Sequence, residues 1–292
     1  MHLPDFQYLA PKDPAELAAM LAEHGDAARI LSGGTDLLVQ MKSPGLRPDY
    51  LIDITGLEEL SNIKFDDGAG LVIGGAAKLE AVMDTPVVKE KYHGLWQSIE
   101  TIGARQIRTM GSLGGNLCNA SPAADTPPAL VAFGAEVTIG NAEGDRSILL
   151  EDFILGNRQT ALATGEYLKT ITLPAPPENS ASAYHHFRVR GGMEIAMAAV
   201  AVYLELDAKA QTISDAKIVL GVVGPAPIRA TGAEQMLIGQ KPDEALAQSA
   251  AQSCADQSKP IDDYRASAEY RREILKVLFE RAFDDAFTNA AR

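Results

Sequence analysis

Two glycine-rich segments carry the residues best suited to bind a ligand. The first, SGGTD at residues 32–36, stands between a strand-like ARIL and a helical LLVQMK. The second, GSLGG at 111–115, is followed by Asn, Ser and Asp side chains up to Asp125. Glycines accept positive φ angles, and without side chains they let a ligand reach the backbone amides. A following helix adds free N–H groups and partial positive charge. The pattern therefore predicts that both segments bind phosphate groups.

Neither segment fits a standard nucleotide-binding motif. The glycines of the second segment lack GxGxxG spacing, and no GK[ST] follows either one, so the Rossmann fingerprint and the P-loop are both excluded. A strand–Gly-Gly–helix turn taken alone is as often an ordinary turn. The side chains after the second segment suit the hydroxyl groups of a ribose or ribityl chain: Asn116, Asn119, Ser121 and Asp125. Two phosphate-binding segments with this lining favour a dinucleotide such as FAD.

The first segment belongs to a predicted β-α-β-α-β unit. Strands are expected at FQYLA, ARIL and YLIDI. Asp13-Pro14-Ala15-Glu16 predicts a helix start. Asp13 can cap the helix N-terminus, proline suits the first turn, and the Glu16 side chain can reach back to the capping residue. Leu17, Met20 and Leu21 continue as an apolar stripe. Strand, turn and helix would together place the glycines at one edge of a small sheet.

The rest of the chain predicts a second subdomain and a further domain. Hairpins are expected at 63–75 and 135–150, and a helical stretch from Leu79 to about Gly103. PAPPENSAS, residues 174–182, is the best linker, and a strand-rich and then helical region follows it. We therefore predict an α+β fold. Its FAD-binding domain spans 1–174, with a small β-α-β unit at about 1–56 and a larger mixed or antiparallel sheet subdomain at 57–174. A C-terminal α+β domain spans 180–292.

Composition excludes several functions. The chain has 292 residues, 46% of them hydrophobic, and a net charge of −13. The acidic balance disfavours nucleic acid and anionic membranes as partners. The N-terminus lacks a signal-peptide pattern, and no run of about 18 apolar residues predicts a membrane span, so a cytoplasmic protein is expected. The two cysteines, Cys118 and Cys254, cannot supply an iron–sulfur or zinc site by themselves.

The sequences SGGTDLLVQMK (32–42) and GSLGGNLCNASPAADTPPAL (111–130) resemble the FAD-binding medium subunit of the molybdenum hydroxylases, a group that includes xanthine dehydrogenase and carbon monoxide dehydrogenase. The resemblance covers essentially the whole chain. It implies non-covalent FAD that takes electrons from a small [2Fe-2S] subunit and passes them to NAD, a quinone or another acceptor. Molybdopterin and the [2Fe-2S] clusters would lie only in partner subunits, the substrate would be oxidised in the large one, and a dimer of heterotrimers is possible.

The resemblance also implies which residues contact FAD. Asp125 would contact the ribityl or ribose part, Leu168 would pack near the cofactor, and His186 would lie in a basic segment beside the isoalloxazine. Many relatives have Lys in place of His186, and some have an aromatic residue in place of Ile195. No residue is expected to act as a catalytic acid or base or to bind a metal. The diphosphate contacts would come from the two glycine segments: Ser32, Gly33, Gly34, Thr35, Asp36 and Leu37, and then Ser112, Leu113, Gly114, Gly115 and Asn116.

Two other functions remain open at this level. A stand-alone FAD oxidase of the vanillyl-alcohol-oxidase type would need a covalent flavin anchor. Only Cys118 and His186 are plausible anchors, and neither lies in that group's motif. A flavin-free assembly subunit is the second alternative, which the intact glycine segments argue against. The four-cysteine insertion of the 4-hydroxybenzoyl-CoA reductase subunit is missing, so the chain resembles the simpler carbon monoxide dehydrogenase type.

Other conspicuous residues have ordinary interpretations. Cys118 is expected to be a small buried residue, because cysteine is among the most buried types. Met193 and Met197, four residues apart, are expected in the core. Arg105 and Arg108 precede the second glycine segment, and the sequence leaves open whether they balance cofactor phosphates or pair with acidic residues.

Overall fold

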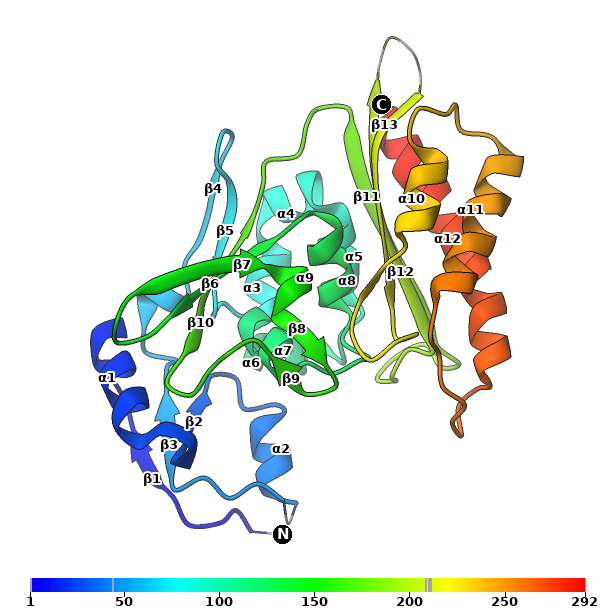
Figure 1. Cartoon of the computed structure of the whole chain (residues 1–292). Coiled ribbons are helices and arrows are strands. Elements are labelled where there is room, and N and C mark those ends of the chain that lie inside the picture. Colours follow the sequence, from blue (N-terminus) through cyan, green and yellow to red (C-terminus); the bar gives the residue numbers. More distant parts are fainter. Residues whose placement is uncertain (1, 44, 208, 210–211, 292) are drawn as a thin grey trace.

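A computed structural model describes residues 2–43, 45–207, 209 and 212–291. Its first part is a small unit around three parallel strands with β3 in the centre, drawn in blue in Figure 1. The predicted β-α-β-α-β order is confirmed. The elements are β1 (Gln7–Leu9), α1 (Pro14–His24), η1 (Gly25–Ala27), β2 (Ala28–Leu31), α2 (Leu37–Met41) and β3 (Tyr50–Asp53).

Helix α1 begins where its capping residues predict. The carboxylate of Asp13 accepts a hydrogen bond from Glu16 N at 2.8 Å, and Glu16 reaches back to Lys12 N at 2.7 Å. Leu17 and Leu21 are buried in one cluster with Ile52 of β3. This packing fixes the helix on the sheet, and with it the edge from which the first glycine segment leaves β2.

The second part is built on a five-stranded antiparallel sheet. Its strand order is β4–β5–β10–β6–β7, and both predicted hairpins are confirmed. The strands are β4 (Ile63–Asp66), β5 (Gly70–Gly74), β6 (Glu136–Gly140), β7 (Asp145–Leu149) and β10 (Tyr167–Leu173). The short 3-10 helix η2 (Glu58–Leu60) precedes β4 and leads into this five-stranded sheet. Beside the five-stranded sheet lies a separate two-stranded sheet, formed by β8 (Ile154–Gly156) and β9 (Gln159–Thr160).

The helices of this part are short. The stretch predicted as one helix from Leu79 is broken into three. Pro86 makes the first break, because it cannot continue the preceding helix and instead starts a new one, and the second lies at Tyr92, whose backbone leaves the helical region. The helices are α3 (Leu79–Asp84), α4 (Pro86–Lys91), α5 (His93–Glu100), α6 (Arg105–Met110), α7 (Leu113–Asn119), α8 (Thr126–Ala132) and α9 (Leu150–Phe153).

The third part is an antiparallel sheet between two helical layers (Figure 1). Helix α12 packs on one face of β11 and β12, and α5 and α8 pack on the other. Strand β12 is therefore buried on both faces along most of its length. The strands are β11 (Ser180–Phe187), β12 (Ala198–Asp207), β13 (Thr212–Gly221) and β14 (Ile228–Arg229), and the helices are α10 (Thr231–Leu237), α11 (Glu244–Gln257) and α12 (Ala268–Ala290).

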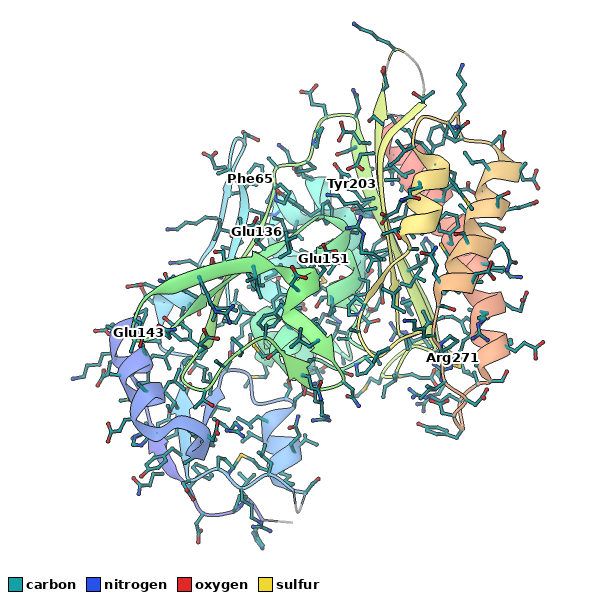
Figure 2. All side chains as sticks on the ribbon, in the orientation of Figure 1. Phe65, Glu136, Glu143, Glu151, Tyr203 and Arg271 are labelled. Carbon is teal, nitrogen blue, oxygen red and sulfur yellow. The ribbon has the colours of Figure 1, made fainter. Side chains whose placement is uncertain are left out.

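The core continues across the seam between the second and third parts. Figure 2 labels Tyr203 on β12. Its ring packs against that of Phe133, with the centroids 5.7 Å apart. Tyr184 of β11 and Val219 of β13 belong to the same buried cluster as Leu95 of α5. The C-terminal sheet thus supports the helices next to the second glycine segment. Within the described residues, no helix combines the length and apolar character that a membrane crossing needs.

Candidate functional site

The two glycine segments meet backbone to backbone. The first lies between β2 and α2, and the second between α6 and α7. A Cβ atom added to Gly33 would lie 2.0 Å from the carbonyl oxygen of Met110 and 2.6 Å from the Cα atom of Gly111. Any side chain at residue 33 would therefore push the segments apart. A second contact joins the helices that follow, since Gln40 Nε2 donates to Asn119 Oδ1 at 3.0 Å.

The first glycine segment leaves its backbone donors unused. Among the described residues, none of the N–H groups from Gly33 to Leu37 has a hydrogen-bond acceptor. Gly34 has a φ of +68°, which glycine adopts without strain. The hydroxyl of Ser32 is buried, and no described group bonds to it. Successive free N–H groups are a usual binding surface for phosphate oxygens, so this segment fits an anionic ligand.

The side chains of the first segment differ in exposure, since Thr35 is half-buried and Asp36 is exposed. Thr35 Oγ1 lies 3.4 Å from the position that a Cβ on Gly111 would take. Protein atoms around the Asp36 carboxyl desolvate it and raise its pKa, against the attraction of Arg158. Leu37 is half-buried and begins α2. Within the described residues, the backbone N–H groups of this segment and the Ser32 hydroxyl are unused hydrogen-bond donors.

The second glycine segment uses most of its donors inside the protein. Leu113 N donates to Ala77 O at 2.9 Å, and Gly114 N donates to Gly75 O at 3.1 Å. A Cβ atom on Gly114 would lie 2.3 Å from Gly75 O. Residue 114 must therefore be glycine for the start of α7 to pack against the end of β5.

The start of α7 presents one glycine to solvent. Ser112 Oγ accepts a hydrogen bond from Gly115 N at 3.1 Å and so caps the helix. Gly115 is exposed, and a Cβ added to it would meet only Ser112 Oγ, at 2.8 Å. Asn116 Oδ1 accepts a hydrogen bond from Thr126 Oγ1 at 2.6 Å. Its side-chain NH₂ group has no partner among the described residues and can reach a ligand.

The side chain of Asp125 is hydrogen-bonded to the C-terminal sheet. Its Oδ1 accepts a hydrogen bond from the hydroxyl of Tyr184, on β11, at 2.7 Å. Burial raises the pKa of the Asp125 carboxyl, while Tyr184 and the charge of Arg188 act in the opposite direction. Burial also raises the pKa of Tyr184 well above its ordinary value, so the hydroxyl remains a donor. This hydrogen bond couples the residue predicted to contact FAD to the C-terminal domain.

His186 lies beside Arg188 in a hollow of about 360 Å³. Arg188 Nε donates to His186 Nε2 at 2.7 Å, and its Nη2 donates to Thr101 O at 2.9 Å. Burial, followed by the charge of Arg188, lowers the pKa of His186 to about 4. The imidazole is therefore neutral at physiological pH, with its proton on Nδ1. The hollow is lined by Glu100, Thr101, His186, Phe187, Arg188, Arg190 and Gly191.

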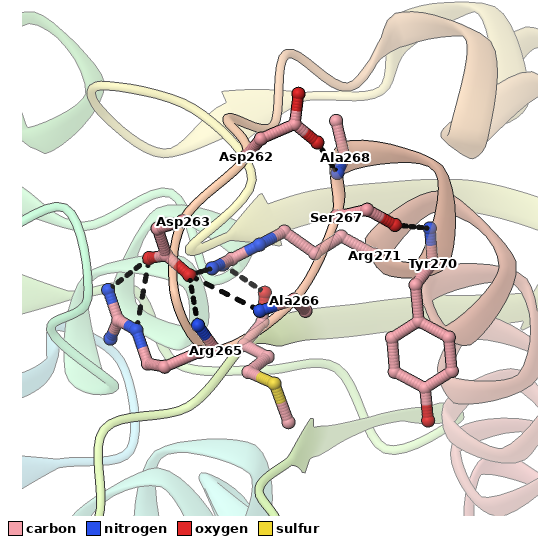
Figure 3. Close-up of polar contacts among 9 residues, drawn as sticks. Asp262, Asp263, Arg265, Ala266, Ser267, Ala268, Tyr270 and Arg271 are labelled. Atoms are coloured by element: carbon pink, nitrogen blue, oxygen red, sulfur yellow. Dashed lines mark hydrogen bonds and ion pairs between the residues drawn. The ribbon is translucent and has the colours of Figure 1, made fainter.

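A buried arginine holds the loop that follows this basic segment. Arg271, on α12, is 2% exposed, and it donates to Met197 O and to Asp263 Oδ1, each at 2.8 Å (Figure 3). Arg265 Nη2 bonds to the other oxygen of Asp263 at 2.6 Å. Burial acts to raise the pKa of Asp263, but the bonds from Arg265 and Arg271 bring it well below its ordinary value. The network ties the end of the β11–β12 loop to the loop before α12.

Two residues lie where the sequence did not predict them. Met193 is 69% exposed, at a φ of +49° in the β11–β12 loop, so its prediction as a core residue is wrong. Met197 is buried as expected. Cys118 is exposed rather than buried, because it lies on the outward side of the short helix α7. Protein atoms nearby still desolvate its thiol and raise its pKa to about 12, which makes it a poor nucleophile. His185, which has no acidic motif in sequence, pairs with Asp285 at 2.8 Å.

Leu168 lies in the core next to the second glycine segment. It is 5% exposed, and a Cβ atom on Gly75 would lie 2.3 Å from its carbonyl oxygen. Gly75 in turn packs against Gly114. Leu168 therefore contacts Gly75, and Gly75 makes the contact with Gly114 that fixes the position of α7.

Sequence reasoning did not identify the partners of residues that act through pairing. Arg105 and Arg108 both pair with Glu80, so of their two possible roles the structure shows the pairing with an acid. Tyr184 and Arg188 connect to the site only because β11 crosses behind Asp125. A pairing preference is visible in sequence, but the partner is not, since these residues lie far apart in the chain. The described residues contain no cluster of His, Cys, Asp and Glu that could hold a metal ion.

The fold and the site define a flavin-type dinucleotide-binding protein with an attached C-terminal α+β domain, and comparison with known proteins identifies its family. Residues 4–176 match the FAD binding domain in molybdopterin dehydrogenase, and residues 182–286 match the CO dehydrogenase flavoprotein C-terminal domain. The chain belongs to the FAD-binding medium-subunit family of the molybdenum hydroxylases. It is the FAD-carrying subunit of an oxidoreductase, and the stand-alone oxidase and flavin-free alternatives are set aside.

Relatives match along the whole chain. The glyceraldehyde dehydrogenase medium chain of Sulfolobus acidocaldarius is 34% identical over 285 residues, which are 98% of this chain and 99% of the relative. The carbon monoxide dehydrogenase medium chain of Afipia carboxidovorans is 32% identical over 290 residues, 98% of each chain. Among solved structures, carbon monoxide dehydrogenase from Hydrogenophaga pseudoflava superposes with a TM-score of 0.94 at 29% identity, covering 99% of each chain. Quinoline 2-oxidoreductase from Pseudomonas putida 86 gives 0.92 at 28% identity, covering 100% of each chain.

Proposed function

We propose that the two glycine segments hold the diphosphate of FAD where they meet. The observation that carries this proposal is the run of N–H groups from Gly33 to Leu37, none of which has an acceptor among the described residues. The unpartnered hydroxyl of Ser32 and the exposed Gly115 support it. The proposed contacts come from Ser32, Gly33, Gly34, Thr35, Asp36 and Leu37, and from Ser112, Leu113, Gly114, Gly115 and Asn116.

The remaining contacts are assigned to the other parts of FAD. Asp125 binds the ribityl or ribose hydroxyls, Leu168 supports the cofactor from the core, and His186 lies near the isoalloxazine. The bond between Asp125 and Tyr184 supports the first role, because it holds the carboxylate in one orientation. The hydrogen bond from Arg188 to neutral His186 supports the third, because it fixes the imidazole at the hollow and leaves the positive charge there on arginine rather than on His186.

The bound flavin supplies the redox chemistry, and this chain supplies binding, orientation and electrostatics. The free amides stabilise the negative diphosphate, which a chain of net charge −13 would otherwise repel. The buried helices α5 and α8 exclude water behind the site. No described side chain is required to move a proton to or from the primary substrate.

The chain fits a multi-subunit dehydrogenase, because its relatives are named as medium chains or FAD subunits. The proposed partners are a small [2Fe-2S] subunit and a large molybdenum-cofactor subunit, with NAD, a quinone or another acceptor receiving the electrons in the cytoplasm. The proposed domains are 1–174, with subdomains at about 1–56 and 57–174, and 180–292. The matched ranges 4–176 and 182–286 support this division.

The substitution Gly115→Ala tests the proposed site. Its methyl group would lie 2.8 Å from Ser112 Oγ, so the flexible Ser112 side chain must move and its capping bond weakens. The rest of the fold should be kept, because no backbone atom lies in the way, while the methyl obstructs the ligand. We expect FAD to bind about tenfold more weakly, the cost of forcing a methyl into a filled contact. The measurement is the dissociation constant of FAD for the full chain, from quenching of flavin fluorescence.

Gly56→Ala is the matched control, because nothing lies within 4 Å of the Cβ it adds. The proposal is wrong if Gly115→Ala and Gly56→Ala bind FAD equally well.

A further inference from the structure

Glu80 is a buried carboxylate to which the FAD site assigns no role. It lies on α3 and is 7% exposed. Its Oε1 pairs with Arg105 Nε at 2.8 Å, and its Oε2 accepts a hydrogen bond from Arg108 Nε at 2.9 Å. Arg108 also donates to the carbonyl oxygens of Glu100 and Ile102, at 3.2 and 3.3 Å. One carboxylate therefore holds both arginines of α6, and Arg108 anchors that helix to the end of α5.

The helix held by Glu80 carries the contact between the two glycine segments. Helix α6 ends at Met110, whose carbonyl oxygen packs against Gly33, and Gly111 follows directly. The residue before Glu80 holds the same point, because Leu79 N donates to Gly111 O at 3.0 Å. The start of α3 thus fixes α6 through a side chain and the second glycine segment through the backbone.

We propose that Glu80 is a positioning residue for FAD binding. By holding Arg105 and Arg108, it seats the end of α6 against Gly33 and keeps the two glycine segments at the spacing that the diphosphate needs. Glu80 itself contacts no part of the cofactor. The proposal rests on the proposed function, because it takes the two glycine segments as the diphosphate site.

A purely electrostatic role for the arginines predicts the opposite sign. If Arg105 and Arg108 attracted the diphosphate directly, then removing the charge of Glu80 would free two guanidinium groups and tighten FAD binding. If Glu80 acts by positioning, then its loss loosens α6 and weakens FAD binding. An ion pair that only stabilises the fold predicts a loss of stability with unchanged FAD affinity in the folded protein.

The test compares Glu80→Gln with Glu234→Gln in the full chain. Glu234 is the matched control, since it is 6% exposed and pairs with Arg229 at 2.7 and 2.8 Å in the C-terminal domain. We expect Glu80→Gln to weaken FAD binding about tenfold and Glu234→Gln to leave it within about twofold, a coupling of ordinary size between neighbouring sites. The measurements are the dissociation constant of FAD, the thermal midpoint of the FAD-free chain, and hydrogen exchange at Met110 and Gly111, which should quicken only in Glu80→Gln.

Arg105→Gln keeps the test decisive if Glu80→Gln does not fold. The Arg105 side chain is 74% exposed, so its removal costs little packing, and a smaller loss of FAD affinity is expected. Tighter or unchanged FAD binding in the folded variants overturns the proposal, as does an equal loss in Glu234→Gln. A wild-type chain that binds no FAD would instead overturn the proposed function.

Discussion

The two glycine segments look alike in sequence but use their backbones differently. The first, at Ser32–Asp36, leaves its N–H groups free, whereas the second donates from Leu113 and Gly114 to the chain around β5. The first segment therefore has free amides for the proposed diphosphate contact, whereas the amides of Leu113 and Gly114 in the second segment fix the start of α7. Equal glycine content does not imply an equal share of ligand binding, because an amide that already has an acceptor is not free to bind phosphate.

The segments are alike in how closely they pack. Gly33 and Gly114 each have a backbone oxygen where a Cβ would lie, at 2.0 and 2.3 Å. Gly34 is glycine for another reason, its φ of +68°. Gly115 is exposed to solvent, and a Cβ there would lie 2.8 Å from the capping oxygen of Ser112, so glycine leaves both the cap and the exposed backbone in place. Glycine thus serves contact, conformation and access at different positions of the same site.

The largest expected effect tests the shared packing. Gly33→Ala and Gly114→Ala should each lower the free energy of unfolding of the FAD-free chain by about 3 kcal/mol, because rigid backbone must move to admit the methyl group. Urea unfolding measures this, with Gly56→Ala as a control that should change the free energy by less than about 0.5 kcal/mol. A Gly33→Ala variant as stable as the control would mean that the two segments do not touch.

A smaller effect tests the free donors of the first segment. Ser32→Ala removes a buried hydroxyl that has no internal partner, so the FAD-free chain should lose no stability. FAD binding should weaken by about 1.5 kcal/mol, roughly tenfold, the usual worth of a hydrogen bond to a charged group. The dissociation constant of FAD is the measurement.

Ser98→Ala is the control for that variant, because Ser98 is fully buried but bonded to Leu95 O at 2.8 Å. It should lose stability and keep its FAD affinity. The same response from both serines would remove the distinction between donors reserved for the ligand and donors used by the fold.

The smallest effect tests the supporting role of the second segment. Ser112→Ala removes the N-cap of α7 and should lower the free energy of unfolding by about 1 kcal/mol. FAD affinity should stay within about threefold, because the Ser112 backbone is unchanged. Thermal unfolding and FAD titration of the same preparation decide this. A loss of FAD affinity larger than that of Ser32→Ala would reverse the roles assigned to the two segments.

Much of the fold is readable in sequence, because local signals determine it. Asp13 and Glu16 cap α1 as predicted, and ARIL forms β2 at its predicted residues. The linker prediction at 174–182 extends past the start of β11 at Ser180, since Ser and Ala resemble a linker until a sheet covers them. The prediction that Met193 lies in the core is wrong, because its four-residue spacing from Met197 indicates a shared face only in a helix, and Met193 lies in a loop between two strands.

The sequence by itself predicted that the two glycine segments bind phosphate and that a FAD-type lining follows them, and it carried the family resemblance, because glycine spacing and capping act over a few residues. Only the tertiary structure decided which segment has free amides, that Asp125 is bonded to Tyr184, and that Arg105 and Arg108 pair with Glu80 rather than remain free for phosphate. Those outcomes depend on residues distant in sequence competing for the same donor or charge. Such competition is settled by packing, which no local pattern contains.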